Sequence, residues 1–343
     1  MDYFERYEDL NVHKTMLEDI PRNSAYQKAI FDNKDSFNGK IVLDVGAGTG
    51  ILSVFCAQAG AAKVYAVEAS NIYKLAQEII KENNVDHIVE VVHSKVEDLK
   101  LDGNEKVDII ISEWMGHYLL HEGMLDSVIY ARDNFLRREG LLFPENVTLF
   151  SSPCSIPSLN ESWANVNGVS MKSFGKQLKE AAMKEPLLIQ INPDDVLSEP
   201  ESVLWLNLHD VTLEDLESIN FRHVTSASKD GRYQGICLWF TCTFPYYSTE
   251  PVILSTGPDD PKTHWLQTVI SLPVDVDVEK GTPLAYDLVL KRSNTSLRKY
   301  TIEMTMLDPE EVEHPIYCGC HMTKCILAKA VIEKYDHGDF SMN

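Results

Sequence analysis

Two glutamates lie nine residues apart in a segment that the sequence places at the end of a strand. Glu113 directly follows the apolar run Val107–Ser112, and Glu122 lies beyond Gly116 and several aromatic side chains. The carboxyl ends of parallel strands are where α/β folds bind ligands. A hairpin-like loop there could turn both carboxylates toward one point. Two separate, solvated loop acids are the alternative.

Convergent carboxylates suit a guanidinium group. A guanidinium stays charged, with a pKa above about 12, and presents five donors in a planar fork. Two carboxylates can bind that fork through charge-assisted, bidentate hydrogen bonds. They can also localise its positive charge away from one nitrogen, whose lone pair can then attack a methyl group in line. Such a transfer needs no metal and no covalent intermediate.

A glycine-rich segment, Val42–Gly50, indicates where the methyl donor would bind. Gly46, Gly48 and Gly50 alternate after an apolar strand, which lets the backbone approach a ligand at a helix N-terminus. Glu68 closes the second strand, 18 residues past Gly50, where an acid can hold both ribose hydroxyls. A nicotinamide site shares these features. A turn with a purely structural role after the strand is a further alternative. The GxGxG spacing favours S-adenosylmethionine. Asp44 favours it too, because an acid at this position repels pyrophosphate but suits a cationic sulfonium.

The third strand is followed by a second acid that could face the same ligand. Val96 and Glu97 come three and four residues after the end of the strand Ile88–His93. We expect them to contact the adenine of the cofactor, Glu97 through its carboxylate. A solvated glutamate after a strand is the alternative.

The elements that carry these residues alternate between strand and helix over residues 40 to 145. Apolar runs at 40–44, 63–67, 88–93 and 107–112 predict strands, and helical patterns at 51–58, 72–83 and 124–136 separate them. Such strands form a parallel sheet covered on both faces. Residues 1–145 are therefore expected to form a Rossmann-like α/β domain that binds S-adenosylmethionine, with a helical lid at its N-terminus.

Residues 146–343 have a different pattern. Strands that alternate apolar and polar residues are expected at 147–151, 235–244, 264–272, 284–290 and 299–306. Turn residues separate them, which predicts an antiparallel β-barrel or sandwich. Residues 159–184, which include Trp163 and Met171, are helical in character and interrupt the pattern. An insertion of this kind usually covers another surface or reaches a partner chain.

Composition bounds the class of protein. The net charge is −21, from 52 acidic and 31 basic residues. Such a surface repels nucleic acid and anionic membrane, and it can steer cationic substrates, although solubility alone also explains it. Seven scattered cysteines are typical of free thiols in a reducing compartment, so we expect cytoplasm, nucleus or both. No apolar run approaches the roughly 20 residues of a membrane span.

The order of these motifs resembles that of the protein arginine methyltransferases. The Glu113–Glu122 loop looks like the double-glutamate loop of that family. The further matches, in chain order, are Tyr3–Tyr7 (YFERY) with His13, Met16, Asp19 and Arg22 after it, Val42–Gly50, Val67–Ser70 (VEAS) and Thr263–Trp265 (THW). They extend from Tyr3 to about Thr268. Each match is modest, but the set is specific.

The resemblance implies a role for each matching residue. Glu113 and Glu122 would bind the substrate guanidinium, and Arg22 would pair with the cofactor carboxylate above Gly46 and Gly48. His264 and Asp19 resemble a pair that either relays the displaced proton or braces the N-terminal helix. The remaining residues implied in substrate binding or product specificity are Tyr3, Tyr7, Met16, Met124 and Trp265.

The family also implies a product and an assembly. Met16 and Met124 match the methionines of type I members, which make monomethyl and asymmetric dimethyl arginine; ordinary core packing is the alternative. Homodimers in the family dock an arm on the partner's Rossmann domain, and residues 159–184 occupy the place of that arm. We therefore expect a homodimer that methylates Arg-rich proteins with S-adenosylmethionine. A non-catalytic relative that binds cofactor or regulates a partner is the alternative.

Three features depart from the family pattern. Pro21 precedes Arg22 and could kink the cofactor-contacting helix. His117 occupies a position that is usually tyrosine. The tail from Glu310 onward does not resemble the family, and it contains Cys318, Cys320, His321 and Cys325. Their spacing is a poor match to zinc motifs, so ordinary thiols and no metal are expected.

Overall fold

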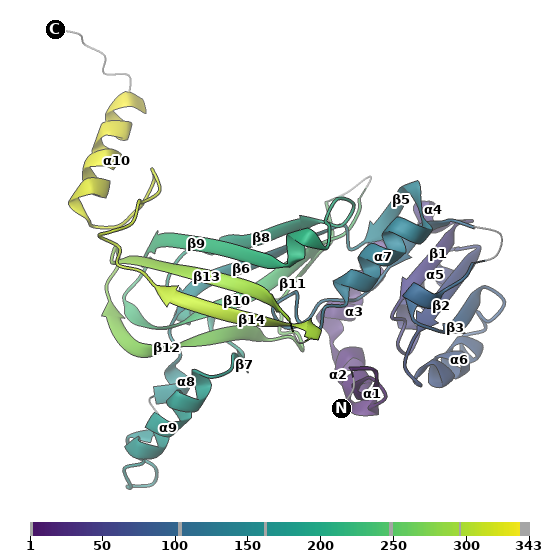
Figure 1. Ribbon diagram of the computed structural model, residues 1–343, viewed down its shortest axis with the longest axis horizontal. Coiled ribbons are helices and arrows are strands. Elements are labelled where there is room, and N and C mark those ends of the chain that lie inside the picture. Colours follow the sequence, from purple (N-terminus) through teal and green to yellow (C-terminus); the bar gives the residue numbers. More distant parts are fainter. Residues whose placement is uncertain (1–2, 102–104, 161–162, 247–249, 295, 337–343) are drawn as a thin grey trace.

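The computed structural model describes residues 3–101, 105–160, 163–246, 250–294 and 296–336 (Figure 1). Short helices open the chain, a parallel sheet with its helices follows, and an antiparallel unit completes it. The helices are α1 (Tyr3–Arg6), α2 (Leu10–Glu18), α3 (Ile20–Asp32), α4 (Lys34–Phe37), α5 (Ile51–Gln58), α6 (Tyr73–Glu82), α7 (Leu125–Phe135), α8 (Pro157–Asn160), α9 (Lys172–Ala182) and α10 (Thr323–Asp336). None of the helices in these ranges is long and apolar enough to cross a lipid bilayer.

The first unit is a five-stranded parallel sheet in the order β3-β2-β1-β4-β5. Its strands are β1 (Ile41–Val45), β2 (Lys63–Glu68), β3 (Val89–His93), β4 (Val107–Ile111) and β5 (Leu136–Phe143). Val42, Leu43, Val64 and Ile110 are 1% exposed or less, as continuous apolar strands require when helices cover both faces. The Rossmann-like domain is therefore confirmed.

Strand β5 was not predicted from the sequence. Arg137, Arg138 and Glu139 are exposed on it, and β5 pairs only with β4 in this sheet. Charged residues are common on edge strands because they discourage pairing with other chains. They also conceal the apolar pattern from which a strand is predicted.

The second unit contains two antiparallel sheets. One has the order β7-β12-β10-β6-β8 with β11 paired to β10, and the other has the order β14-β13-β9. The strands are β6 (Asn146–Cys154), β7 (Leu187–Ile189), β8 (Glu201–Asn207), β9 (Ser218–Ser226), β10 (Gly231–Thr243), β11 (Ile253–Ser255), β12 (Gln267–Val278), β13 (Pro283–Ser293) and β14 (Ser296–Met306). Within the described ranges no hydrogen-bonded ladder joins the two sheets, so the expected antiparallel domain is barrel-like rather than a closed barrel.

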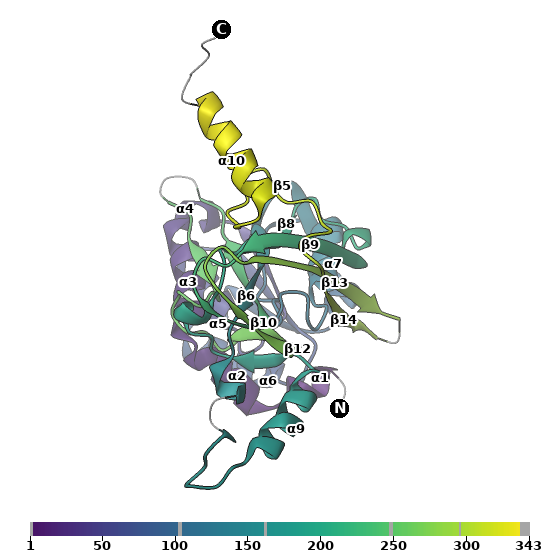
Figure 2. The same ribbon diagram turned by 90° about the vertical axis from the view of Figure 1, so that its left-hand side faces the viewer.

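Two helical segments project from the antiparallel unit on different sides. Helix α9 extends from one side and α10 from the other (Figure 2), and α8 lies beside α9 (Figure 1). The ring of Trp163 packs edge-on against Phe174 within the first segment, at 4.6 Å between centroids. Helices α8 and α9 thus form a small arm within the expected segment 159–184, of which residues 161–162 lie outside the described residues.

Pro21 starts a helix instead of bending one. Helix α2 ends at Glu18, and Asp19 caps α3 by accepting a hydrogen bond from the Arg22 backbone nitrogen at 3.0 Å. Pro21 is the second residue of α3. An N–H in the first turn has no partner within the helix, so its loss costs little there. The expected kink is therefore wrong, and Pro21 favours the orientation of Arg22.

Candidate active site

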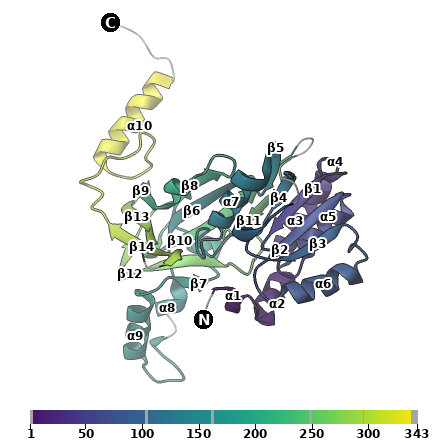
Figure 3. The ribbon, with the colours of Figure 1, turned by 45° about the vertical axis from the view of Figure 1, so that its right-hand side comes forward.

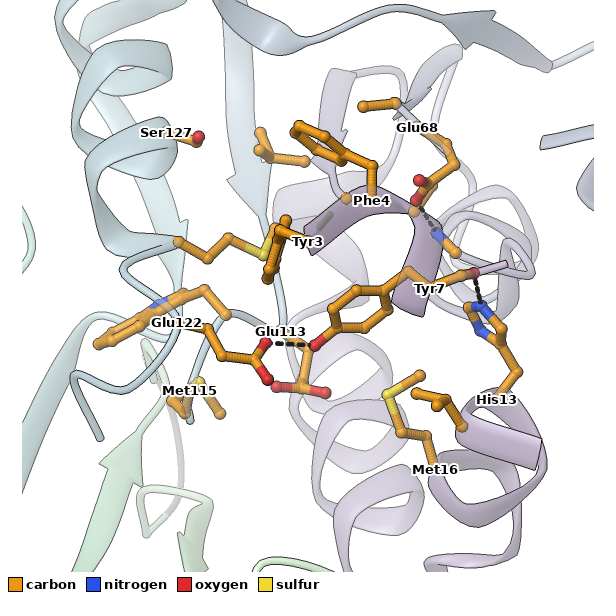
Figure 4. A pocket seen from close by; sticks show the side chains of 18 of the residues that line it. Tyr3, Phe4, Tyr7, His13, Met16, Glu68, Glu113, Met115, Glu122 and Ser127 are labelled. Carbon is orange, nitrogen blue, oxygen red and sulfur yellow. Dashed lines mark hydrogen bonds between the residues drawn. The ribbon is translucent and has the colours of Figure 1, made fainter. Parts of the chain in front are cut away.

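A cavity of about 330 Å³ lies where the opening helices, the parallel sheet and the antiparallel unit meet. The carboxyl ends of β1, β2 and β4 form its floor, and α1 and α2 cover it with aromatic and sulfur-containing side chains (Figure 4). Fourteen of the sixteen residues expected in the site line it. They are Tyr3, Tyr7, Met16, Arg22, Gly46, Gly48, Glu68, Val96, Glu97, Glu113, Glu122, Met124, His264 and Trp265.

The loop between the two glutamates forms a tight hairpin. The backbone nitrogens and oxygens of Gly116 and Leu119 exchange two hydrogen bonds of 2.9 Å. A Cβ atom on Gly116 would lie 2.2 Å from the His121 carbonyl oxygen, so only glycine fits. Leu119 and Glu122 have positive φ angles of 67° and 74°, a backbone strain that is concentrated at functional sites. The hairpin brings Glu122 back to Glu113.

The two carboxylates converge on one part of the cavity (Figure 4). The Tyr7 hydroxyl donates to Glu122 at 2.6 Å, and Arg6 forms an ion pair with the other oxygen at 3.3 Å. Arg22 Nε donates to Glu113 at 2.9 Å, and both of these side chains are less than a tenth exposed. Both acids are therefore held by positive or hydroxyl donors of the chain itself, which rules out the alternative of solvated loop acids.

The glycine loop forms the opposite wall. Gly46 and Gly48 have φ angles of 72° and 56°. A Cβ atom on Gly46 would lie 2.2 Å from the Met124 Cε atom, so a larger residue would have to displace the end of the Met124 side chain. The Glu68 carboxylate accepts hydrogen bonds from the backbone nitrogens of Gly48 at 2.8 Å and Ser70 at 2.7 Å. These contacts hold an acid at the end of β2, beside the glycine loop.

Asp44 does not line the cavity. Its carboxyl group is completely buried at the end of β1, where Ser53 donates to Oδ2 at 2.6 Å and Oδ1 has no hydrogen-bond partner. Burial, with a further contribution from the negative charge of Glu68, raises the pKa of Asp44 to about 7. Asp44 is therefore not placed for the direct contact with a cationic cofactor that the sequence led us to expect. The reason is that the side chain points behind the loop, toward α5.

The segment after β3 forms one end of the cavity. Val96 is buried in a short 3-10 helix, Val96–Asp98, and Ser127 of α7 donates to Glu97 at 2.6 Å. Glu97 is thus held by a neighbouring hydroxyl rather than freely solvated. The backbone oxygen of Glu97 also accepts from Tyr130 at 3.1 Å.

Asp19 lies outside the cavity and holds two elements together. Its Oδ2 accepts from the backbone nitrogen of His264 at 2.8 Å and from His264 Nδ1 at 2.6 Å, while its Oδ1 caps α3. Burial alone raises the pKa of Asp19, but these hydrogen bonds outweigh it and the pKa falls below its ordinary value. The geometry accounts fully for the bracing role: Asp19 joins the antiparallel unit to the helix that carries Arg22.

The lid has contacts that the sequence pattern did not reveal. Arg298 of β14 lies 3.9 Å from the centroid of the Tyr3 ring, and its Nη1 donates to the Glu122 carbonyl oxygen at 3.1 Å. Arg298 and Arg6 both line the cavity. Arg6 lies inside the YFERY segment and could have been considered, whereas Arg298 comes from a distant strand without any local signal. Tyr7 also anchors the lid, because its carbonyl oxygen contacts His13 Nε2 at 2.8 Å.

Two histidines of the hairpin are held in neutral form. His117 Nδ1 lies 3.3 Å from the Trp265 carbonyl oxygen, and the Trp265 indole donates to the Met115 carbonyl oxygen at 2.8 Å. Burial lowers the pKa of both His117 and His121. The hairpin therefore adds little positive charge near Glu122 at neutral pH.

Comparisons with known proteins agree with this arrangement. Residues 147–307 match the family model "arginine methyltransferase oligomerization subdomain", and residues 30–129 match that of ribosomal protein L11 methyltransferase. Protein arginine N-methyltransferase 6 of Danio rerio is 39% identical over 319 residues, which cover 91% of this chain and 90% of that protein. The chain belongs to the protein arginine N-methyltransferase family. The protein arginine N-methyltransferase 6 of Xenopus tropicalis is 40% identical over 87% of this chain and 88% of its own length.

Solved structures of arginine methyltransferases have the same fold. Protein arginine methyltransferase 10 of Arabidopsis thaliana superimposes with a TM-score of 0.78 at 35% identity, covering 89% of this chain and 94% of that one. The Trypanosoma brucei protein arginine methyltransferase 1 enzyme–prozyme heterotetramer with S-adenosylhomocysteine gives 0.78 at 32% identity, with coverages of 88% and 94%. Family membership thus favours a methyltransferase over the nicotinamide alternative.

Proposed function

We propose that this protein transfers methyl groups from S-adenosylmethionine to guanidino nitrogens of arginine in proteins. The products are monomethyl and asymmetric dimethyl arginine. The observation that carries the proposal is the convergence of Glu113 and Glu122 beside a glycine loop in one cavity (Figure 4). The non-catalytic alternative is not favoured, because every acid and arginine that the reaction needs is in place.

The cavity fits the proposed methyl donor. Gly46 and Gly48 line the cavity with bare backbone, and Glu68 is fixed at the end of β2 where it can hold ribose hydroxyls. Val96 and Glu97 line the end expected to take adenine, and Arg22 can pair with the amino-acid carboxylate. When bound, the group supplies a methyl carbon on a positively charged sulfur.

The residues of the chain supply positioning and charge. Glu113 and Glu122 grip the guanidinium fork and draw its positive charge toward themselves. This would leave a lone pair available on the nitrogen of the fork that is turned toward the glycine loop, where the methyl donor would be held. Tyr7 and Arg22 restrain the two carboxylates, so little reorganisation accompanies the reaction.

Product type and proton release depend on three further residues. Met16 and Met124 line the cavity, and their flexible thioethers can pack beside a nitrogen that already carries one methyl group. His264 has its Nδ1 committed to Asp19, which leaves Nε2 as the only ring nitrogen that could take the proton released by methylation. Bracing of the lid is the second role of this pair.

Assembly and location follow from other features. We propose a homodimer in which the α8–α9 arm docks on the Rossmann-like domain of the partner, because the arm exposes apolar side chains and residues 147–307 match an oligomerization subdomain. Seven free thiols favour the cytoplasm, the nucleus or both. The charge of −21 favours Arg-rich protein partners over nucleic acid or anionic membrane.

Radiolabelled methyl transfer tests the function. An Arg-rich peptide should acquire label and its Lys-substituted twin should not, and mass spectrometry of the product should show asymmetric dimethyl arginine. Glu122→Gln removes one charge from the grip and should lower kcat/KM by roughly 10²- to 10⁴-fold, the scale of a lost buried ion-pair partner. Glu82→Gln, at the exposed end of α6, is the matched control and should leave the rate unchanged. Label on the lysine peptide, or full activity of Glu122→Gln, would overturn the proposal.

A further inference from the structure

The tail beyond β14 brings three cysteines and a histidine to one point. His314 Nδ1 lies 3.3 Å from Cys318 Sγ, 3.4 Å from Cys320 Sγ and 3.2 Å from Cys325 Sγ. The four atoms all lie within 4.8 Å of one another, and the three cysteines are 9% exposed or less. The histidine is His314 and not His321, which the sequence spacing suggested. His321 instead donates its backbone N–H to the Gly281 carbonyl oxygen.

The hydrogen bonding of His314 leaves its other nitrogen free for a ligand role. Nε2 lies 2.8 Å from the Pro309 carbonyl oxygen, to which only an N–H can donate. In the neutral ring Nδ1 is then the nitrogen without a proton, and it presents a single lone pair. A backbone carbonyl that accepts from the other ring nitrogen in this way, and so fixes the tautomer, is a usual partner of a metal-bound imidazole.

Ordinary thiol packing does not account for the cluster. One lone pair can accept one S–H group, yet three sulfur atoms surround Nδ1 at similar distances. The cysteines also form a small cluster with Met322 that is separate from the large hydrophobic cores. A centre that binds all four atoms at once satisfies every one of them.

We propose that His314, Cys318, Cys320 and Cys325 bind a structural zinc ion. In tetrahedral zinc sites the Zn–S bonds are about 2.3 Å and the Zn–N bonds about 2.0–2.1 Å, which places ligand atoms roughly 3.5–3.8 Å apart. The observed separations from Nδ1 are close to that range. Three thiolates and one imidazole are soft donors that select zinc over magnesium or calcium. Because the protein supplies all four ligands, the site is closed and structural rather than catalytic.

The surroundings suit the charge of such a site. A zinc ion with three thiolates carries one net negative charge. Cys325 lies in the first turn of α10, where the helix dipole favours negative charge. Lys324, beside it, donates to the Val312 carbonyl oxygen at 3.0 Å and so holds the loop that carries His314. The ion would therefore join this loop to the start of α10.

The location explains what the ion would stabilise. The tail projects from the end of the antiparallel unit that lies away from the parallel sheet (Figures 1 and 3). The backbone nitrogens of Leu307 and His321 donate to Ala285 and Gly281 in that unit. The match to the oligomerization subdomain ends at residue 307, so the four proposed ligands lie beyond it. Zinc would fix the orientation of α10 without taking part in methyl transfer.

Metal analysis of the purified full-length protein tests the proposal. After dialysis against a weak chelator we expect about one zinc ion per chain. His314→Ala and the double change of Cys318 and Cys320 to serine should each lower the zinc content at least tenfold. His321→Ala, the matched control in the same tail, should retain it. His314→Cys should also retain it, because four thiolates form a common zinc site.

Thiol accessibility provides a second measurement that does not depend on folding of the variants. In the unmodified protein, a strong chelator should release the zinc, expose three more thiols to a disulfide reagent and speed proteolysis within residues 308–336. Methyl transfer should stay unchanged, so this result is independent of the proposed function. Protein without metal after growth in zinc, zinc that His314→Ala retains, or a disulfide among these cysteines would each overturn the proposal.

Discussion

Glu113 and Glu122 reach the same point of the cavity by different routes. Glu113 comes directly from the end of β4, whose residues are buried. Glu122 returns through a hairpin that requires Gly116 and a positive φ at Glu122 itself. The second glutamate is thus positioned at the expense of local backbone strain. Strain of this kind persists only where the surrounding contacts, here with Tyr7, Arg6 and Arg298, hold it.

Asp44 makes a testable contribution to stability. Burial and the charge of Glu68 raise its pKa to about 7 in the folded protein, against 3.8 when unfolded. Between these values the folded state binds a proton that the unfolded state releases. The contribution of this group to stability therefore decreases as pH rises toward 7 and stays at its lowest above it.

Asp44→Asn removes that ionisation and can still accept the hydrogen bond from Ser53. In cofactor-free protein we compare the Tm of the variant minus the Tm of the wild type at two pH values. This difference should be more positive at pH 8 than at pH 5, by about 2 °C or more. Asp86→Asn, on the surface, is the control and should show no such trend. A Tm difference that is equal at both pH values would contradict the assignment.

At the scale of elements, the N-terminal helices have two different roles. α1 and α2 cover the cavity, whereas α3 is capped by Asp19 and directs Arg22 toward Glu113. The Asp19 carboxylate thus caps α3 and joins it by a hydrogen bond to the His264 loop of the antiparallel unit. The lid and Glu113 are therefore coupled through few residues.

If the α8–α9 arm forms the dimer interface, a charged side chain introduced into it should disrupt the dimer. Val169, Met171 and Phe174 are 53%, 40% and 48% exposed, which is unusual for a group of apolar side chains unless a partner covers them. Met171→Glu should weaken dimerisation at least about tenfold, measured by sedimentation or light scattering against twice the chain mass of 38.8 kDa.

Leu213→Glu serves as the control for the arm. Leu213 is 48% exposed but lies just before the 3-10 helix Glu214–Leu216, away from the arm. It should leave the dimer intact. If wild type is monomeric at micromolar concentration, or both variants dissociate equally, the arm is not the interface.

At the scale of the whole molecule, the net charge of −21 should govern how fast a basic substrate is captured. Increasing salt from about 0.01 to 0.3 M shortens the Debye length from roughly 30 Å to below 10 Å. We expect kcat/KM for a peptide with several arginines to fall about tenfold over this range, mainly through KM. A peptide with one arginine between neutral residues should change much less, and an equal response of both peptides would show that steering is not the cause.

The sequence determined the features that depend on neighbouring residues. The glycine loop, the strands that precede Glu68 and Glu113, and the arm were all predicted within a few residues, because periodicity, glycine spacing and turn residues act over short distances. The family motifs then linked these pieces to one chemistry. Pro21 and β5 show the limit of this reasoning: a helix start and a charged edge strand have weak local signals.

Only the tertiary structure decided which distant residues meet. Arg298 reaches Tyr3 and Glu122 from a strand 176 residues beyond that glutamate. Asp44 points behind the glycine loop because its side of β1 faces α5. His314, and not His321, lies beside the cysteines. The backbone nitrogen of His321 is instead hydrogen-bonded to the Gly281 carbonyl oxygen of the antiparallel unit. Each of these outcomes depends on long-range packing, which leaves no period or spacing in the sequence.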